Sequence, residues 1–406
     1  MTPRPLLRSL DLFSGIGGIT RALHGLAEPL AYCDWAIESR RALQANMQAG
    51  RLPKAPISAD VRELGADWLT KHAKAMPDII VGGFPCVGFS TAGHRKGFGE
   101  HQSGLFSEIL RLADETRCPL LFLENVTNVI NIGMHDVAHE LATKRGYELR
   151  WCVVAAEDMG APHRRARWFC LACRPGYRIR WPKATRYSPH PWTAATMPPR
   201  AINVATNGTR ASMRLLGNSV VPDAVRYAFL YLVGGCETVP KTLSTPAGYS
   251  LAPAKKKTGI PPGRRVFSPG RIEWPKCGIV SQTDRTPISC TQLPPFRASM
   301  RLKLVFDPTL FRTSKPPSDT IRQPRLTEPM QANKWATPRH GCITGVNYIT
   351  ERTTHDLPTQ VRFEASTRDR DRAGGVNPDF VEWLMGYPRG WTSAGGDLRT
   401  QTGSVS

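Results

Sequence analysis

Short apolar runs alternate with helical patterns along the first 173 residues of this 406-residue chain. Six runs are typical of buried strands: residues 6–12, 30–33, 79–82, 120–123, 151–155 and 168–172. Apolar positions recur with helical spacing at residues 19–26, 39–47 and 105–113. This alternation predicts an α/β fold with a doubly wound, mostly parallel sheet and helices on both faces. Ligands of such sheets bind at the carboxyl ends of the strands.

The rest of the chain departs from this alternation. Residues 174–210 are rich in Pro, Trp and Arg without a clear period, which predicts a short irregular arm. A helical pattern with one apolar face begins at Pro222, so we assign residues 1–173 and 211–233 to one domain. Frequent prolines beyond residue 234 predict irregular structure, ending in a flexible tail at residues 393–406.

The formal net charge of +21 is spread along the chain. Residues 1–232 carry 29 Lys and Arg against 19 Asp and Glu, and residues 233–406 carry 25 against 14. Such a field suits a polyanion such as DNA or RNA, because Lys and Arg neutralise phosphates. The alternative is a basic soluble protein without a nucleic-acid partner.

Ten cysteines without a framework spacing indicate reduced thiols in a cytosolic protein. A single Cys-x-x-Cys pair, Cys170 and Cys173, lies in an apolar run with no second pair nearby, so we expect no metal site. The first residues lack the apolar core of a signal peptide. The best apolar helix, near residues 220–233, is short and contains Asp223 and Arg226, so we expect no membrane span.

One cysteine stands where a predicted strand ends in a glycine-rich loop, Gly82-Gly83-Phe84-Pro85-Cys86-Val87-Gly88-Phe89-Ser90. A thiol at a strand terminus is held on a rigid element while the glycines let a substrate approach the backbone. Cys86 is therefore a candidate nucleophile. The alternative is a small buried hydrophobic side chain.

A second glycine-rich turn, Asp11-Leu12-Phe13-Ser14-Gly15-Ile16-Gly17-Gly18, follows the first strand and opens a helix. Such a turn brings backbone close to a cofactor, although it is a weak signal alone. Asp34 and Asp60 stand at the ends of later predicted strands, where an acid commonly binds ribose hydroxyls. Trp35, next to Asp34, can stack on adenine or fill a core.

These motifs occur with three others in a fixed order over residues 6 to about 232. The others are Glu124-Asn125-Val126, Arg165-Ala166-Arg167 and Leu216-Gly217-Asn218-Ser219-Val220-Val221-Pro222. Together the five resemble the motifs of the DNA cytosine-5 methyltransferases. The resemblance implies a Rossmann-like methyltransferase fold, and the long tail is similar to that of bacteriophage-borne members.

The resemblance also implies a mechanism. The Cys86 thiolate would add to carbon 6 of cytosine, and Glu124, with a raised pKa, would hydrogen-bond or protonate ring nitrogen 3. Carbon 5 would then take the methyl group of S-adenosyl-L-methionine. Arg165 would hold the cytosine carbonyl, with Asn125 and Arg167 supporting the pocket. For Arg167 the alternative is an ion pair with an acid elsewhere.

Cofactor-binding residues follow from the same motifs. The resemblance assigns them as Phe13, Ser14, Gly15, Gly17, Gly18, Asp34, Trp35, Asp60, Val61, Pro85, Asn218 and Ser219. Family members usually have Glu where Asp34 stands, so the shorter carboxylate has less reach toward the ribose.

The loop after Cys86 carries the expected DNA contacts Ser90, His94, Arg95 and Lys96. Duplex DNA hides the target base, so the base must be flipped out and a loop must close behind it. We expect double-stranded DNA as the partner of a monomer without an obligatory protein partner, in the cytoplasm of a bacterial or phage-infected cell. The alternatives are an RNA cytosine-5 methyltransferase and a catalytically inactive DNA-binding protein.

The order of the last motifs departs from the family pattern. Residues 377–392 resemble the family's penultimate motif, displaced beyond its usual successor. Residues 236–376 would then form a second, irregular and basic domain for target recognition, with Arg339, His340, Asn347 and Arg352 as possible base contacts. This assignment predicts that truncation after Val233 leaves cofactor binding intact but abolishes site-specific methylation.

Overall fold

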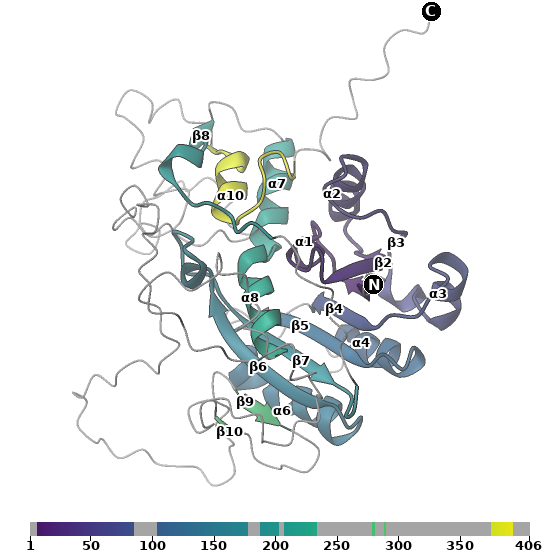
Figure 1. Ribbon diagram of the computed structural model, residues 1–406. Coiled ribbons are helices and arrows are strands. Elements are labelled where there is room, and N and C mark those ends of the chain that lie inside the picture. Colours follow the sequence, from purple (N-terminus) through teal and green to yellow (C-terminus); the bar gives the residue numbers. More distant parts are fainter. Residues whose placement is uncertain are drawn as a thin grey trace, which may run out of the picture.

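A mixed sheet forms the centre of the protein in the computed structural model, which describes residues 6–84, 104–177, 187–202, 207–233, 278–280, 288–289 and 375–392 (Figure 1). The strand order is β10-β9-β6-β7-β5-β4-β1-β2-β3. The strands are β1 (Leu7–Leu12), β2 (Ala27–Cys33), β3 (Ile57–Ser58), β4 (Ile79–Gly83), β5 (Leu120–Val126), β6 (Glu148–Ala155), β7 (Ala166–Cys173), β9 (Gly278–Val280) and β10 (Ile288–Ser289).

The strands from β3 to β5 are parallel to their neighbours, and β7 runs antiparallel between β5 and β6. All six predicted strands are present, so the α/β prediction is confirmed. Strands β5, β6 and β7 extend beyond the apolar runs that predicted them. The extension of β5 carries Glu124 and Asn125, which places these polar residues at the carboxyl end of the strand.

Successive residues of the central strands face two different apolar clusters. In β4, Ile79 and Val81 belong to one cluster and Ile80 to the other. Helices α1 (Gly18–Ala22), α2 (Ile37–Gln48), α7 (Asn207–Asn218) and α8 (Pro222–Leu232) contribute to the first cluster. Helices α3 (Ala66–His72), α4 (Gly104–Glu115), α5 (Val129–Ile132) and α6 (Met134–Ala138) contribute to the second. The sheet is therefore covered on both faces.

Two predicted boundaries are wrong. The helix expected at residues 19–26 ends at Ala22, because the chain turns at Gly25 with a left-handed φ of 75°. The irregular arm expected at residues 174–210 ends earlier, since α7 begins at Asn207. The described part of that arm contains a short 3₁₀ helix (Ala194–Thr196) and strand β8 (Ala201–Ile202).

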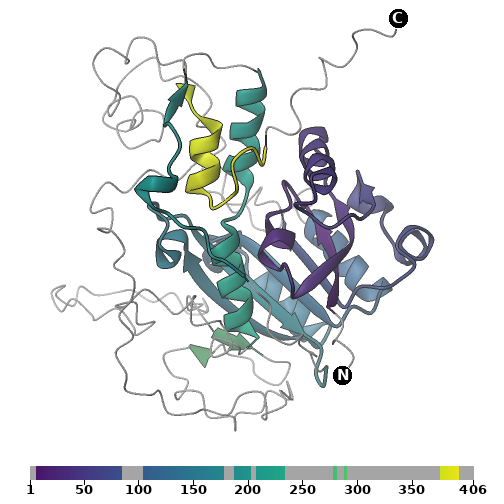
Figure 2. The same cartoon turned by 45° about the horizontal axis from the view of Figure 1, so that its top comes forward.

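The C-terminal part of the described chain returns to the α/β domain. Strand β11 (Gly375–Val376) pairs antiparallel with β8. Helix α10 (Pro378–Leu384) follows and lies beside α7, as Figures 1 and 2 show from two directions. Most of residues 236–374, including the four residues named for base contacts, lies outside the described residues, as do residues 393–406.

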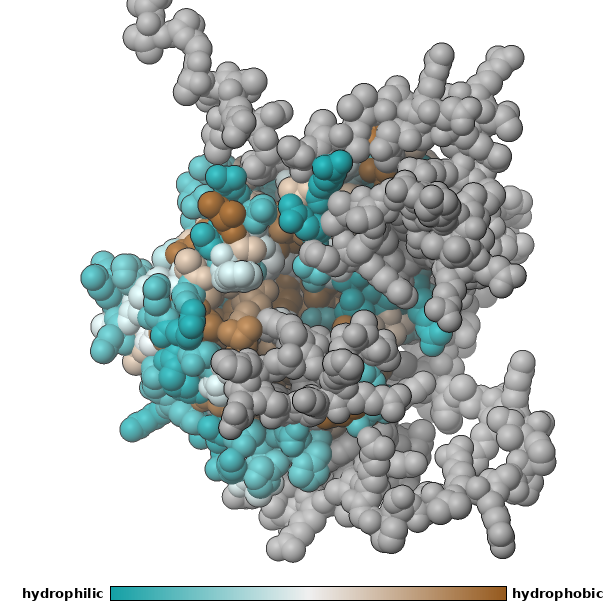
Figure 3. Space-filling view, turned by 180° about the vertical axis from the view of Figure 1, so that it is seen from behind, coloured by the Kyte–Doolittle hydropathy of each residue, from teal (hydrophilic) through white to brown (hydrophobic). Residues whose placement is uncertain are grey.

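The described surface is mainly polar on the face shown in Figure 3, with apolar residues gathered near its centre. Three large apolar side chains in the described ranges are exposed: Trp35 at 86%, Ile37 at 49% and Leu105 at 37%. Trp35 and Ile37 follow β2, so they lie at the carboxyl edge of the sheet. An exposed indole at this edge is available to stack on a planar ligand.

Candidate active site

The ends of β4 and β5 bring two sequence motifs together. The strands are parallel, and Gly83 lies opposite Glu124 in their register. A Cβ atom at position 83 would lie 2.6 Å from Glu124 Oε2, so a side chain there would displace this carboxylate from its position. In the sequence, Cys86 follows Gly83 by three residues.

Asn125 connects the two strand ends. Its Nδ2 donates a hydrogen bond to the carbonyl oxygen of Phe84 at 3.2 Å, and its Oδ1 accepts one from the Val126 amide at 2.8 Å. The side chain is 2% exposed. Asn125 therefore holds the start of the Cys86 loop against the end of β5.

The Glu124 carboxylate is buried beside two arginines. Arg167, on the neighbouring strand β7, places its Nε 3.0 Å from Glu124 Oε1. Burial raises the pKa of Glu124, while the nearby charges of Arg167 and Arg165 oppose this rise. Because desolvation is the largest effect, the protonated form of Glu124 is favoured relative to an exposed glutamate.

Arg165 has a strained backbone and a buried side chain. Its φ is +25°, which non-glycine residues rarely adopt, and the residue is 5% exposed. Its Nη2 donates to the carbonyl oxygen of Gly217 at 2.9 Å and also to that of Ser219. Arg165 thus joins the β7 motif to the turn that ends α7.

That turn contains the last two predicted cofactor residues. The Ser219 hydroxyl donates to the carbonyl oxygen of Leu216 at 2.9 Å, which closes the turn internally. Ser219 is buried, whereas Asn218 is exposed.

The loop after β1 has three residues with left-handed backbone. The φ angles are 53° at Phe13, 55° at Gly15 and 78° at Gly17. The Ser14 amide donates to the carbonyl oxygen of Cys33 at 3.0 Å, which ties the loop to the end of β2. A Cβ atom at Gly15 would meet nothing within 4 Å, so this loop borders open space at the carboxyl edge of the sheet.

Asp34 supports this loop from the end of β2. Its Oδ2 accepts from the Gly15 amide at 2.8 Å and its Oδ1 from the Ala36 amide at 2.9 Å. Burial raises the pKa of Asp34, and these two amide hydrogen bonds oppose the rise. The short carboxylate is therefore fixed by its own chain, beside the exposed ring of Trp35.

Asp60 and Val61 lie after β3. The Asp60 carboxylate pairs with Arg62, whose Nε lies 3.0 Å from Oδ1, and this side-chain hydrogen bond lowers the pKa of Asp60. Asp60 also caps the short 3₁₀ helix (Val61–Glu63), while Val61 is 4% exposed. Any ligand of Asp60 must share the carboxylate with Arg62.

Another acidic residue lies beneath the loop after β1. Asp11 is fully buried, and its Oδ2 accepts a hydrogen bond of 2.5 Å from the Thr20 hydroxyl. Burial raises its pKa to about 7. Sequence reasoning treated Asp11 only as part of the glycine-rich motif.

The 377–392 motif contains two aromatic residues whose contacts with the loop after β1 and with the turn after α7 the sequence did not predict. Trp391 Nε1 donates to the carbonyl oxygen of Ile16 at 2.9 Å, and Tyr387 Oη donates to that of Val220 at 3.0 Å. Their sequence spacing could have marked them as a buried pair, but it carries no information about their partners.

Six predicted site residues lie outside the described residues: Pro85, Cys86, Ser90, His94, Arg95 and Lys96. The others from the sequence converge on the carboxyl edge of the sheet. Glu124, Asn125, Arg165 and Arg167 form one group, and the loop after β1 with Asp34 forms another. The Gly217–Ser219 turn connects them through Arg165.

A model of the C-5 cytosine-specific DNA methylase family matches residues 7–201. The Type II methyltransferase M.CviJI of Paramecium bursaria Chlorella virus IL3A is 30% identical over 392 residues, covering 94% of this chain and 96% of the viral protein. This chain belongs to the C-5 cytosine-specific DNA methylase family. It is a DNA (cytosine-5-)-methyltransferase, and the recognition made from the sequence motifs is confirmed.

Other proteins match this methyltransferase over shorter lengths. The Type II methyltransferase M.Bsp6I of a Bacillus species is 32% identical over 176 residues, covering 42% of this chain and 53% of that protein. The crystal structure of a Spodoptera frugiperda DNMT2 mutant has a TM-score of 0.34 and 19% identity, covering 51% of this chain and 64% of that one.

Family membership implies S-adenosyl-L-methionine as the methyl donor and DNA as the substrate. The residues at the carboxyl edge fit this donor, since a glycine-lined loop borders open space next to a buried carboxylate and an exposed indole. In the described part of the methyltransferase, no helix has the length and apolar character needed to cross a bilayer.

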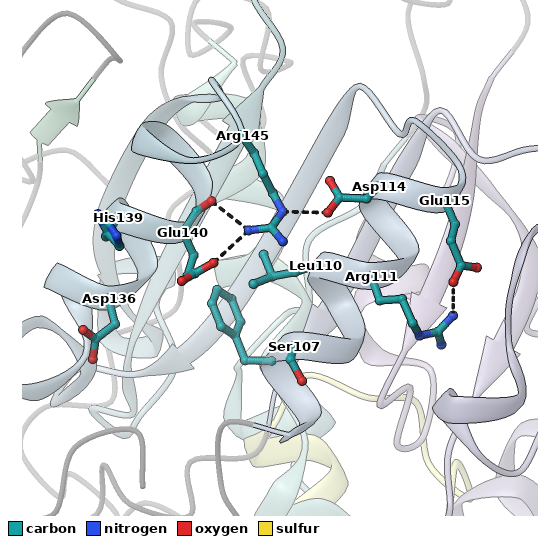
Figure 4. A pocket seen from close by; sticks show the side chains of 10 residues that line it. Ser107, Leu110, Arg111, Asp114, Glu115, Asp136, His139, Glu140 and Arg145 are labelled. Atoms are coloured by element: carbon teal, nitrogen blue, oxygen red, sulfur yellow. Dashed lines mark hydrogen bonds and ion pairs between the residues drawn. The ribbon is translucent and has the colours of Figure 1, made fainter. Parts of the chain in front are cut away.

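A separate pocket of this methyltransferase lies between α4 and the segment 134–145 (Figure 4). Its charged side chains pair with one another: Arg145 contacts Glu140 at 2.8 Å and Asp114 at 3.0 Å, and Arg111 contacts Glu115 at 2.8 Å. None of the predicted site residues lines it. The Arg145–Asp114 pair joins this segment to α4.

Proposed function

We propose that this enzyme methylates carbon 5 of cytosine in duplex DNA through a covalent adduct with Cys86, after flipping the base out of the helix. The observation that carries the proposal is the position of Glu124. Its buried carboxyl has two arginines beside it. Glu124 also lies opposite Gly83, which ends β4, the strand that leads to Cys86.

The two oxygens of Glu124 have different surroundings. Oε1 faces Arg167 at 3.0 Å, and Oε2 lies over the position that a Gly83 Cβ would occupy. We assign Oε2 to ring nitrogen 3 of the cytosine. The raised pKa of Glu124 favours a proton on the carboxyl, which can then donate to nitrogen 3 while Arg167 fixes the other oxygen.

With nitrogen 3 hydrogen-bonded, the Cys86 thiolate adds to carbon 6, and the electron pair of the 5,6 double bond moves to carbon 5. Bound S-adenosyl-L-methionine supplies an electrophilic methyl group. After carbon 5 has been methylated, a base removes its proton, the double bond re-forms and the Cys86 thiolate leaves. No net oxidant or reductant is needed.

Arg165 lies between Glu124 and the turn after α7, to which this proposal assigns part of the cofactor. Its hydrogen bonds to Gly217 and Ser219 support a role in holding the turn after α7, residues 217–221 and hereafter the late turn, close to Glu124. In this proposal it also holds the cytosine carbonyl. Asn125 keeps the Cys86 loop in place through Phe84.

The cofactor lies along the loop after β1. In this proposal Phe13, Gly15 and Gly17 line its methionine and adenosine parts, Asp34 binds the ribose, and Trp35 stacks on the adenine. The 86% exposure of Trp35 supports stacking over a core role. The remaining cofactor contacts are Ser14, Gly18, Asp60, Val61, Pro85, Asn218 and Ser219.

DNA recognition completes the proposal. The DNA backbone near the flipped base is contacted by Ser90, His94, Arg95 and Lys96. The target sequence is read by residues 236–376. We place the enzyme among the type II modification methyltransferases, as the names of its relatives suggest.

The proposal is tested with purified enzyme and S-adenosyl-L-methionine that carries a tritiated methyl group. Wild-type enzyme should label cytosine in duplex DNA, and Cys86→Ser should bind the cofactor without labelling DNA. Labelling of RNA of the same sequence in preference to duplex DNA would support the RNA alternative. Unchanged turnover in Cys86→Ser would contradict the covalent mechanism.

A further inference from the structure

Two aromatic side chains of the C-terminal segment, residues 377–392, contact both loops to which the proposed function assigns the cofactor. Tyr387 Oη donates to the carbonyl oxygen of Val220 in the late turn, and Trp391 Nε1 donates to that of Ile16 in the loop after β1. The two ring centroids are 5.5 Å apart. Both side chains are almost completely buried, at 1% and 0% exposure.

The tightest contact is at Gly18, where α1 begins. A Cβ atom at this position would lie 2.3 Å from Tyr387 Oη and 2.7 Å from Val220 Cγ2. The absence of a side chain at Gly18 therefore lets three segments meet: the loop after β1, the late turn and the C-terminal segment.

The segment that carries the two rings is held to α2 and α1. Asn46 Nδ2 donates to the carbonyl oxygen of Trp391 at 2.9 Å, and Arg51 Nη1 donates to that of Gly390 at 2.8 Å. The Arg21 guanidinium lies 5.0 Å from the centre of the Trp391 ring. These contacts tie the segment to α1, to α2 and to the residues that follow α2.

A buried carboxylate fixes the turn between the rings. Glu382 is 1% exposed and accepts hydrogen bonds of 2.6 Å from the Gly390 amide, the Thr392 amide and the Thr392 hydroxyl. The turn is thus rigid independently of any ligand, so the rings have a fixed position against the cofactor loop.

We propose that Tyr387 and Trp391 are positioning residues that hold the loop at 13–18 against the turn at 217–221 in the form that binds S-adenosyl-L-methionine. The inference rests on the proposed function, which places the cofactor at these loops. A loop that is already ordered loses less conformational freedom on binding, so its affinity is higher. Removing either hydrogen bond should weaken cofactor binding and leave the rate at saturating cofactor nearly unchanged.

The test compares two tryptophans of the same segment in the full-length protein. Trp391→Phe removes the bond to Ile16, whereas Trp383→Phe removes a bond of 3.0 Å to the Thr196 hydroxyl, on the side of the arm. Calorimetric titration should show S-adenosyl-L-methionine binding about tenfold weaker in Trp391→Phe and within about twofold of wild type in Trp383→Phe. The Kd for duplex DNA should be the same in both variants.

Tyr387→Phe, which keeps the ring and removes only the hydroxyl, should weaken cofactor binding in the same direction. Thermal unfolding of each variant measures the structural cost separately. Equal cofactor affinities in Trp391→Phe and Trp383→Phe would overturn the inference, as would a loss of thermal stability alone. If the wild-type protein itself does not bind the cofactor, the proposed function fails instead.

Discussion

Glu124 is the residue at which burial changes chemistry most directly. The carboxyl lies at the end of β5, and desolvation raises its pKa although Arg167 is only 3.0 Å away. An ordinary surface glutamate would be ionised at neutral pH and could not donate to a ring nitrogen. The sequence motif identified this residue, but its environment follows only from the register that sets it opposite Gly83.

Glu124→Gln keeps the shape of the side chain and removes its titration. We expect kcat to fall by about 10²-fold to 10⁴-fold, because a positioned acid contributes about that much, with cofactor Kd unchanged. In wild type, kcat should fall as pH rises through the raised pKa of Glu124. Steady-state rates measured across pH check both expectations.

Glu148→Gln is the matched control. Burial also raises the pKa of Glu148, but this residue begins β6 and pairs in register with Cys173, at the opposite end of β7 from Arg167. Its kcat should equal that of wild type. A similar loss in both variants would mean that Glu124 acts through stability rather than chemistry.

Asp11 should make the stability of the protein depend on pH. Burial raises its pKa to about 7, above its value in the unfolded chain, so its contribution is present at low pH and is lost as pH rises toward 7. Asp11→Asn should remove this component, which is at most about 1.4 kcal/mol per pH unit. Urea unfolding between pH 5 and pH 8 measures the difference.

Asp136→Asn, in which an exposed carboxyl is replaced, should keep the wild-type dependence on pH. An identical slope in Asp11→Asn and wild type would show that Asp11 is ionised in the folded protein over this whole range.

At the scale of elements, the strands of the sheet were predicted best, because short-range patterns encode them. The central strands are short runs of apolar residues, since both of their faces are buried, and these runs give their positions directly. Strand β3 has only two residues and gives no periodic signal. The start of α7 at Asn207 was missed because the sequence before it has no clear hydrophobic period.

The packing of β11 and α10 could not be predicted, since it depends on residues far apart in the sequence. Asn377 caps α10 and donates through Nδ2 to the carbonyl oxygen of Pro199 at 2.6 Å. His163, two residues before Arg165 in the sequence, places its Nε2 2.9 Å from the carbonyl oxygen of Leu384. The motif at 377–392 was visible in the sequence, but its partners were not.

These contacts change the expectation for truncation after Val233. A fragment of residues 1–233 lacks Tyr387 and Trp391, so we now expect its affinity for S-adenosyl-L-methionine to fall by more than about tenfold. A chain in which a flexible linker replaces residues 290–374 should keep that affinity and lose site-specific methylation. Calorimetry measures the affinity of both proteins for S-adenosyl-L-methionine. Wild-type affinity in the 1–233 fragment would contradict the role of residues 377–392 in cofactor binding.

At the scale of the whole molecule, one edge of the sheet gathers residues from most of the sequence. The loop after β1, the ends of β4 and β5, the start of β7, the late turn and the C-terminal segment all meet there. The region between α8 and β11 is attached at both ends to elements that pack on this domain.

The most direct test of the covalent mechanism is trapping on duplex DNA that contains 5-fluorocytosine, whose fluorine blocks the final elimination. Wild-type enzyme with S-adenosyl-L-methionine should form a stable protein–DNA complex. Peptide mass spectrometry should locate the methylated base on Cys86, and Cys86→Ser should form no complex. A wild-type enzyme that methylates ordinary duplex DNA but forms no adduct, or forms it on another residue, would contradict the account.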